Sequence, residues 1–113
     1  PIDILFSIPM GGGTDIGNAL NYIHNKISRP MDSILFLISD LDDGGSLERL
    51  LAELDKLISR KTRIQCILAL NDEGKPVYNK KIADLFETFG IPVYSSKPDD
   101  FPEILCKQLE KLS

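Results

Sequence analysis

The sequence is poor in the residues that mark several functional classes. It contains no Trp, one His and two Cys among its 113 residues. No Ser-His-Asp or Cys-His arrangement accompanies His24, so we expect a solvated surface side chain there rather than a catalytic base. The absence of a Cys-x-x-Cys pair removes support for a zinc or redox site. Because free Cys is among the most buried residue types, we expect Cys66 and Cys106 to be buried free thiols.

Positive charge and long hydrophobic runs are also scarce. The 13 Lys and Arg residues are outnumbered by 17 Asp and Glu residues, which gives a net charge of -4 and no basic run. This balance argues against a nucleic-acid or anionic-membrane partner. The longest apolar run, residues 34–38, is too short to span a bilayer. With no basic and apolar leader in the sequence, we expect a cytoplasmic protein.

Short apolar segments alternate with amphipathic ones along the chain. Apolar runs predict strands at residues 2–8, 33–39, 63–70 and 91–95. Helical spacing of apolar residues predicts helices at residues 15–28, 46–60, 79–89 and 102–112. This order predicts one α/β domain, or part of one, with a doubly wound, mostly parallel sheet and helices on both faces.

Two loops at the ends of the first two strands carry the chemically distinctive residues. Three glycines lead to Thr14 and Asp15 at the start of the first helix, and Asp40, Asp42 and Asp43 follow the second strand. Loops after parallel strands share one edge of a sheet, where ligands usually bind. Oxygen ligands of this kind suit Mg²⁺, with Mn²⁺ or Ca²⁺ as alternatives. A simpler explanation stays open, in which Thr14 or Asp15 only caps the helix.

These two loops also carry a resemblance to a known family. The segment Gly12-Gly13-Thr14-Asp15-Ile16-Gly17-Asn18-Ala19-Leu20 resembles the second metal-site motif of von Willebrand factor A (VWA) domains. The apolar run that ends in Ser39-Asp40 is similar to the third motif. The likeness is closest to bacterial intracellular CoxE-like VWA proteins, spans nearly the whole chain, and implies a Rossmann-like fold. The first motif, Asp-x-Ser-x-Ser, is absent, so the resemblance implies that residues 1–113 are a VWA domain truncated at its N-terminus.

The resemblance implies a metal-dependent protein-interaction module, not an enzyme. Thr14 would bind the cation directly and Asp40 directly or through water, with Asp15, Asp42 and Asp43 as further candidate ligands. Without the first motif, the site is expected to bind metal weakly or to stay unoccupied. An acidic side chain of a partner protein would complete the metal shell, and the bacterial relatives imply AAA+ ATPases as a partner class. The missing first strand also predicts that residues 33–39 form a bare apolar edge that favours self-association.

Two other functions start from the same loops. The Asp40 and Asp42 loop is similar to the Asp-x-Asp loop of Toprim domains, which use Mg²⁺ in phosphoryl transfer. Those domains also need an upstream Glu after a strand, and residues 2–9 contain none. A phosphate-binding role for the glycine loop is disfavoured, because the sequence lacks the Lys of a P-loop and does not fit the Rossmann glycine pattern.

Overall fold

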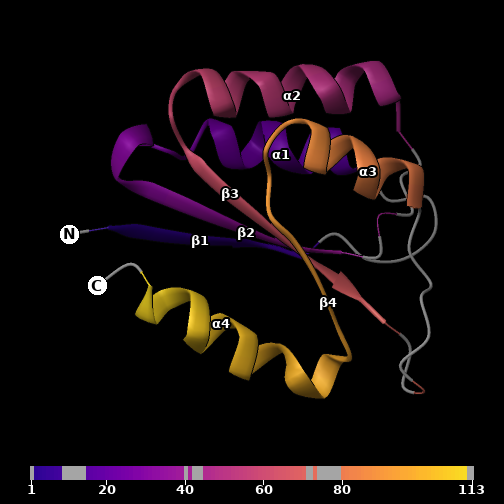
Figure 1. The fold of residues 1–113 in the computed structure, drawn as a ribbon. Helices are drawn as coiled ribbons and strands as arrows, with labels where there is room; N and C mark the ends of the chain where they lie inside the picture. Colours follow the sequence, from indigo (N-terminus) through magenta and orange to yellow (C-terminus); the bar gives the residue numbers. More distant parts are fainter. Residues whose placement is uncertain are drawn as a thin grey trace.

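A computed structural model of the chain describes residues 2–8, 15–39, 41, 45–70, 73 and 80–111. These residues form a four-stranded parallel sheet with helices on both faces (Figure 1). The predicted α/β class, parallel sheet and two-sided helix cover are therefore confirmed. Among the described residues, no helix has the length and apolar character needed to cross a membrane.

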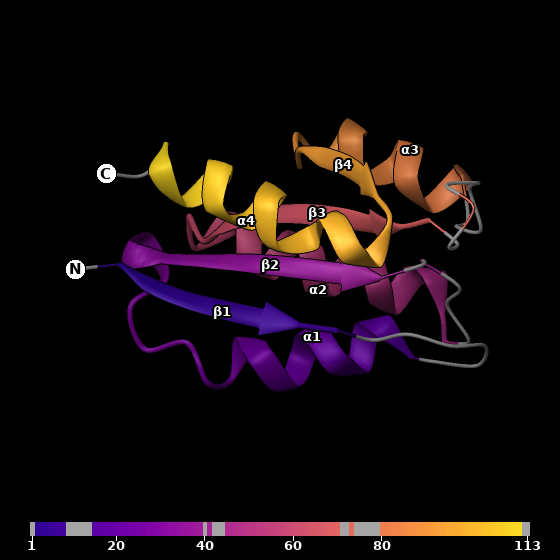
Figure 2. The same ribbon diagram turned by 90° about the horizontal axis from the view of Figure 1, so that it is seen from below.

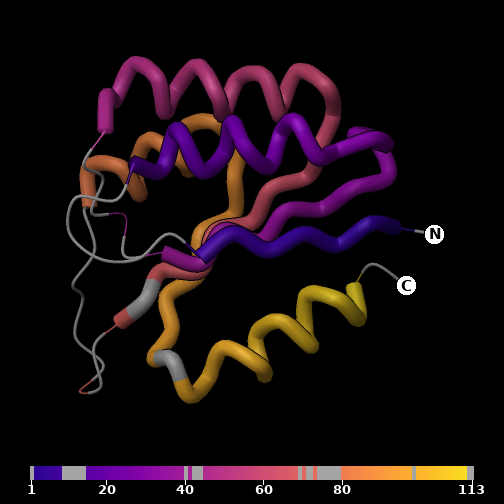
Figure 3. The backbone as a smooth tube through the Cα atoms, turned by 180° about the vertical axis from the view of Figure 1, so that it is seen from behind, coloured from indigo at the N-terminus to yellow at the C-terminus, as the bar shows by residue number. Residues whose placement is uncertain are grey.

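Strands and helices alternate as the sequence predicts. The strands are β1 (Asp3–Ser7), β2 (Ser33–Ser39), β3 (Arg63–Ala69) and β4 (Val93–Ser96). The helices are α1 (Ile16–His24), α2 (Leu47–Ser59), α3 (Lys80–Thr88) and α4 (Phe101–Glu110), with short 3₁₀ turns at Pro30–Asp32 and Pro98–Asp100. Helices α1, α2 and α3 cover one face of the sheet and α4 lies on the other, as the views from opposite sides agree (Figures 1 and 3).

The order of strands in the sheet is β1-β2-β3-β4, so β2 is an interior strand. Its first five residues pair in parallel with β1, from Asp3 opposite Ser33 to Ser7 opposite Leu37. All seven residues of β2 are buried. The prediction that residues 33–39 form a bare edge is therefore wrong, because residues 3–7 occupy that position themselves. The outer strands are β1 and β4.

The main core lies between the sheet and helices α1 to α3. Alternate residues of β2, such as Leu35 and Leu37, pack there with Leu50, Leu54 and Phe86. Phe36 belongs to the opposite face, since successive side chains of a strand point to opposite sides. It is fully buried and stacks on Phe6, with ring centroids 5.6 Å apart. Both faces of β2 are thus apolar, which explains its unbroken hydrophobic sequence.

The two cysteines differ in environment. Cys66 is a buried free thiol on β3, as predicted, and its burial raises its pKa to about 12. Cys106 is also free but exposed, so its predicted burial is wrong. It lies on α4, whose Ile104, Leu105 and Leu109 are only partly buried. A helix that buries one narrow stripe leaves the positions beside that stripe in solvent.

Two helices end in the same hydrogen-bonded turn but with different residues at its left-handed position. After α3, Gly90 N–H donates to the carbonyl of Glu87 and Ile91 N–H to that of Phe86, at 2.9 and 3.0 Å. After α2, Lys61 and Thr62 make the equivalent bonds at 2.9 and 3.1 Å. This pattern is the Schellman motif. Gly90 has φ 79°, as its predicted position past the helix requires, whereas Lys61 adopts φ 69° with a side chain.

We expect Lys61→Gly to raise the free energy of unfolding by about 0.5–1 kcal/mol. The substitution removes about 1–2 kcal/mol of left-handed strain and adds about 0.5–1 kcal/mol of backbone entropy to the unfolded chain. Gly90→Ala should lower stability by a similar amount, because a methyl group there meets no atom within 4 Å and only the backbone conformation opposes it. Urea unfolding midpoints at unchanged m-value measure both effects. Shifts in the same direction for the two variants would contradict this account of the helix ends.

Candidate functional site

The candidate ligands divide between described and undescribed parts of the chain. Thr14, Asp40, Asp42 and Asp43 lie outside the described residues, so their predicted roles stay predictions. Asp15 is described and stands at the start of α1. The structure therefore describes the strands and helices that flank the two predicted metal loops, together with one of the proposed ligands.

Asp15 is the N-cap of α1, one of the two capping candidates in the sequence. Its Oδ1 accepts a hydrogen bond from the backbone N–H of Asn18 at 2.9 Å. The carboxylate thereby satisfies one of the free amides of the first helical turn and lies at the positive end of the helix dipole. The side chain is partly exposed. The capping hydrogen bond is by itself sufficient to explain an Asp at this position. Any metal contact would be an additional role.

Gly45 brings the second loop against the first. A Cβ atom placed on Gly45 would lie 2.5 Å from Asp15 Oδ1 and 2.7 Å from its Cγ. Only a residue without a side chain allows this approach. Gly45 stands just before Ser46, the N-cap of α2, whose side chain accepts from Arg49 N–H at 3.3 Å. Asp15 and Gly45, the described residues that lead into α1 and α2, therefore lie side by side.

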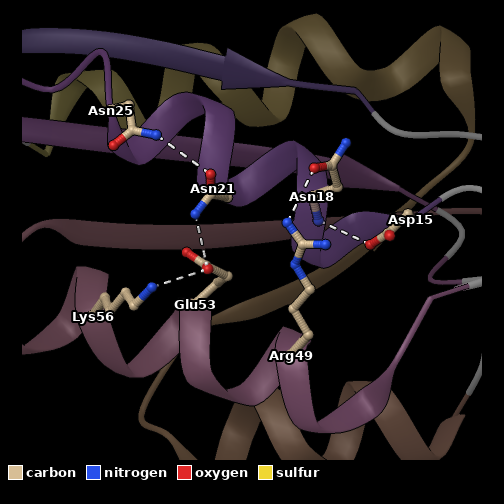
Figure 4. A network of polar contacts seen from close by, with 7 residues as sticks. All are labelled: Asp15, Asn18, Asn21, Asn25, Arg49, Glu53 and Lys56. Atoms are coloured by element: carbon tan, nitrogen blue, oxygen red, sulfur yellow. Dashed lines mark hydrogen bonds and ion pairs between the residues drawn. The ribbon is translucent and has the colours of Figure 1, made fainter.

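The first turns of α1 and α2 are in close contact. A Cβ atom on Gly17 would lie 3.2 Å from the backbone nitrogen of Leu50. The guanidinium of Arg49 donates to the side-chain oxygen of Asn18 at 3.2 Å (Figure 4). Because each helix starts directly after one of the two loops, this contact sets the distance between the loops.

The end of β2 shows backbone strain beside Asp40. Leu41 adopts φ 56°, a left-handed conformation that is rare for a residue with a side chain. Its N–H donates to Ser39 Oγ at 2.9 Å, and both side chains are fully buried. Strained residues of this kind cluster at functional sites. Ser39 and Leu41 are thus tied to one another at the end of β2, a contact that hydrophobicity patterns did not indicate.

A buried carboxylate links the two helices further along. Glu53 of α2 is only 3% exposed. Its Oε1 accepts from Asn21 Nδ2 of α1 at 3.0 Å and from Lys56 Nζ at 3.2 Å (Figure 4). Burial by itself would raise the pKa of Glu53, but these hydrogen bonds and the charge of Lys56 outweigh it and lower the pKa below its ordinary value. Glu53 is therefore ionised at neutral pH.

A surface groove of about 460 Å³ lies between the last turns of α1 and α2. Its lining includes His24, Lys56 and Arg60. His24, expected at the surface, is partly buried in this wall. Lys56 and Arg60 are cationic side chains near the C-terminus of α2, where they offset the negative end of its dipole, so these two residues have a local explanation. The groove is at the opposite end of the helices from Asp15 and does not belong to the predicted metal site.

The described residues contain no group of three or more His, Cys, Asp or Glu side chains that could hold a metal ion. Asp15 is the candidate ligand among them. Its carboxylate oxygens have the chemistry that a hard divalent cation prefers, and Gly45 lies against them. The donor chemistry therefore fits such a cation, with the remaining candidate ligands on residues 14, 40 and 42.

We expect Gly45→Ala to destabilise the protein by about 1 kcal/mol, the usual value of an N-cap. The added methyl group would displace the Asp15 carboxylate from Asn18 N–H. In an Asp15→Ala background the same change should cost much less, because the cap is already gone. A double-mutant cycle in urea unfolding measures this coupling. Strictly additive effects would show that Gly45 and Asp15 act independently.

We expect Glu53→Gln to reduce stability at neutral pH by about 1–3 kcal/mol, because it removes charged hydrogen bonds. A carboxyl whose pKa is lowered by folding contributes stability above its ordinary pKa and loses it as pH falls through the folded value. Below about pH 4.5 the wild type should therefore lose stability more steeply than Glu53→Gln. Unfolding midpoints measured at several pH values test this.

The control is Glu103→Gln, which removes a carboxylate from an exposed pair with Lys107 at 3.5 Å. Exposed pairs contribute little, so this variant should match the wild type across the same pH range. Equal acid sensitivity of Glu53→Gln and the wild type would contradict the role of Glu53.

Comparison with known proteins agrees with the fold and with the sequence resemblance. The family described as VWA domain containing CoxE-like protein matches residues 1–105. Over 110 residues the chain is 26% identical to the uncharacterized protein YehP of Escherichia coli (strain K12). The match covers 97% of this chain and 29% of that relative's length. No solved structure matches significantly. The parallel α/β sheet and this match over nearly the whole chain show that the protein belongs to the CoxE-like VWA family.

Proposed function

We propose that this chain contributes to a metal-dependent protein-interaction site of the VWA type. The observation that supports it is the contact of Gly45, just before α2, with the carboxylate of Asp15, just before α1. Both loops carry the motif residues of the resemblance. We further propose that residues 1–113 are the C-terminal part of such a domain, since the Asp-x-Ser-x-Ser motif is absent.

Four residues would hold the cation: Thr14, Asp15, Asp40 and Asp42. A bound Mg²⁺ would supply an open coordination position for a carboxylate of the partner. Asp15 uses Oδ1 to cap α1, so Oδ2 is the oxygen of this carboxylate that we assign to the cation. Ser39 and Leu41 would orient the second loop through their buried contact. In this proposal the residues position and bind, and none carries out a chemical step.

The proposed partner is a protein with an exposed Asp or Glu. A cation flanked by aspartates is only partly neutralised, so an incoming carboxylate completes both its charge and its coordination. AAA+ ATPases stay the partner class that the family resemblance implies. The Toprim alternative has no support among the described residues, and it is retained only as an outcome of the experiment below.

Titration with Mg²⁺ and Mn²⁺ by calorimetry tests the proposal. Because the first motif is absent, we expect weak but saturable binding in the wild type and its loss in Thr14→Ala, which removes the hydroxyl ligand. Ser39→Ala should weaken binding, since the Leu41 N–H loses its acceptor beside Asp40. Thr88→Ala is the matched control, because its hydroxyl bonds the Asp84 carbonyl on α3. An acidic peptide should bind only in the presence of metal.

Absence of binding at millimolar metal would contradict the proposal for this chain and point to a site that needs the first motif. Equal binding by wild type and Thr14→Ala would contradict the assigned ligands. Metal-dependent nicking of DNA by the chain, abolished by Asp40→Asn, would favour phosphoryl transfer instead.

A further inference from the structure

Arg49 is a cation in the first turn of α2, beside the start of α1. Both helices begin at the edge of the sheet at which β1 and β2 end (Figure 2). The stem of Arg49 lies against Gly17, where an added Cβ would be 3.3 Å from Arg49 Cγ. Its guanidinium donates to Asn18 Oδ1 at 3.2 Å, and the Asn18 N–H donates in turn to Asp15 Oδ1 at 2.9 Å (Figure 4). The charge is therefore held on the α1 side, close to the candidate ligand Asp15.

Arg49 makes no ion pair with an acidic side chain of the described structure. Glu53 stands four residues further along α2, at the spacing of a helical ion pair. The Glu53 carboxylate accepts from Asn21 and Lys56 instead. The hydrogen-bond partner of Arg49, the Asn18 amide, is neutral. An arginine has five N–H donors, so several are left for an acidic group from outside this helix pair.

The position of Arg49 is unfavourable for a cation by helix chemistry. The first turn is the positive end of a helix dipole, where acidic side chains are stabilising. Ser46 is the N-cap of α2, and a Glu or Gln three residues later would complete a capping box with it. The chain has Arg49 there instead. Departures from such local rules are expected at functional sites, which points to a role for the positive charge.

The charge of Arg49 acts on the place assigned to the cation. Two hydrogen bonds through one residue keep the guanidinium within about 10 Å of the Asp15 carboxylate. This separation is close to the Debye length at physiological ionic strength. Repulsion between Arg49 and a divalent cation at Asp15 is therefore weakened by salt but not abolished. An acidic group bound to Arg49 would remove the repulsion.

We propose that Arg49 lowers the affinity of the site for its cation until an acidic group of the partner protein neutralises it. This role rests on the proposed metal-dependent function, and it identifies the partner as one that offers two carboxylates, one for the cation and one for Arg49. A guanidinium can hold a carboxylate by two parallel hydrogen bonds. Because coupling between two ligands is reciprocal, the acidic segment also binds more tightly when the cation is present.

Calorimetric titration with Mn²⁺ at low ionic strength tests the repulsion. Arg49→Gln should bind Mn²⁺ about two- to fivefold more tightly than the wild type, because it removes the charge and keeps an amide that can donate to Asn18. The difference should shrink as NaCl is added. Arg49→Lys keeps the charge and should match the wild type. Arg60→Gln is the control, since it removes an exposed cation at the other end of the same helix and should leave the affinity unchanged.

The direction of the change separates this role from a structural one. If Arg49 only held α1 against α2, its replacement would weaken Mn²⁺ binding or leave it unchanged. We expect Arg49→Glu, which completes the capping box with Ser46, to bind Mn²⁺ more tightly still and not to lower the urea midpoint. Circular dichroism and urea unfolding show whether each variant keeps its fold.

Two short peptides with blocked ends, Asp-Gly-Asp and Asp-Gly-Asn, test the second carboxylate. With Mn²⁺ present, the wild type should bind the peptide with two carboxylates more tightly than the peptide with one. Arg49→Gln should bind the two peptides equally. Thr14→Ala, which lacks the hydroxyl ligand, measures any binding of peptide or metal outside the site.

The possible failures are distinguishable. Equal or weaker Mn²⁺ binding by Arg49→Gln at low salt would overturn this inference and leave the proposed function standing. An equal preference of wild type and Arg49→Gln for the peptide with two carboxylates would overturn the assignment of the second acid. Absence of Mn²⁺ binding in every variant would contradict the proposed function itself. In a version of the protein that includes the first motif, loss of the gain in Arg49→Gln would show that an acid of that part, not of a partner, pairs with Arg49.

Discussion

The close contact between the first turns of α1 and α2 is the constraint on which the candidate site depends. Gly17 permits it, because any side chain there would press on the backbone of Leu50. Each helix continues directly from a loop that follows a strand, so the helix spacing becomes the loop spacing. The hydrogen bonds from Arg49 to Asn18 and from Asn21 to Glu53 hold that spacing along the pair. A wider helix separation would move Gly45 away from Asp15.

Two locally unfavourable features are each offset by burial or by hydrogen bonds. Leu41 is held in a left-handed conformation that costs about 1–2 kcal/mol, while its fully buried side chain contributes about 1.5–3 kcal/mol. Burial of the Glu53 carboxylate is offset by Asn21 and Lys56. In both cases apolar packing or paired hydrogen bonds stabilise a group that would be unfavourable alone. The buried packing of Leu41 thus supports its left-handed conformation directly after β2.

Much of the fold could be predicted because the responsible signals are local. The helix starts at Asp15 and Ser46 follow from capping chemistry, and the turn at Gly90 follows from its freedom at positive φ. The burial of Glu53 and the exposure of Cys106 could not be predicted in this way. Their environments depend on which side chains of other elements lie opposite them, and residue type alone points to the reverse assignment.

The sequence by itself determined the alternation of strands and helices, the parallel sheet, the family resemblance and the two loops that carry the candidate oxygen ligands. Periodicity, capping and motif spacing are properties of residues close together in the chain, so they can be recognised without the folded structure. Only the tertiary structure decided that β1 pairs with β2, that Gly45 rests on Asp15, and that Glu53 of α2 is buried against Asn21 of α1. These features join residues far apart in the chain, where several pairings satisfy the same hydrophobic pattern and packing selects one.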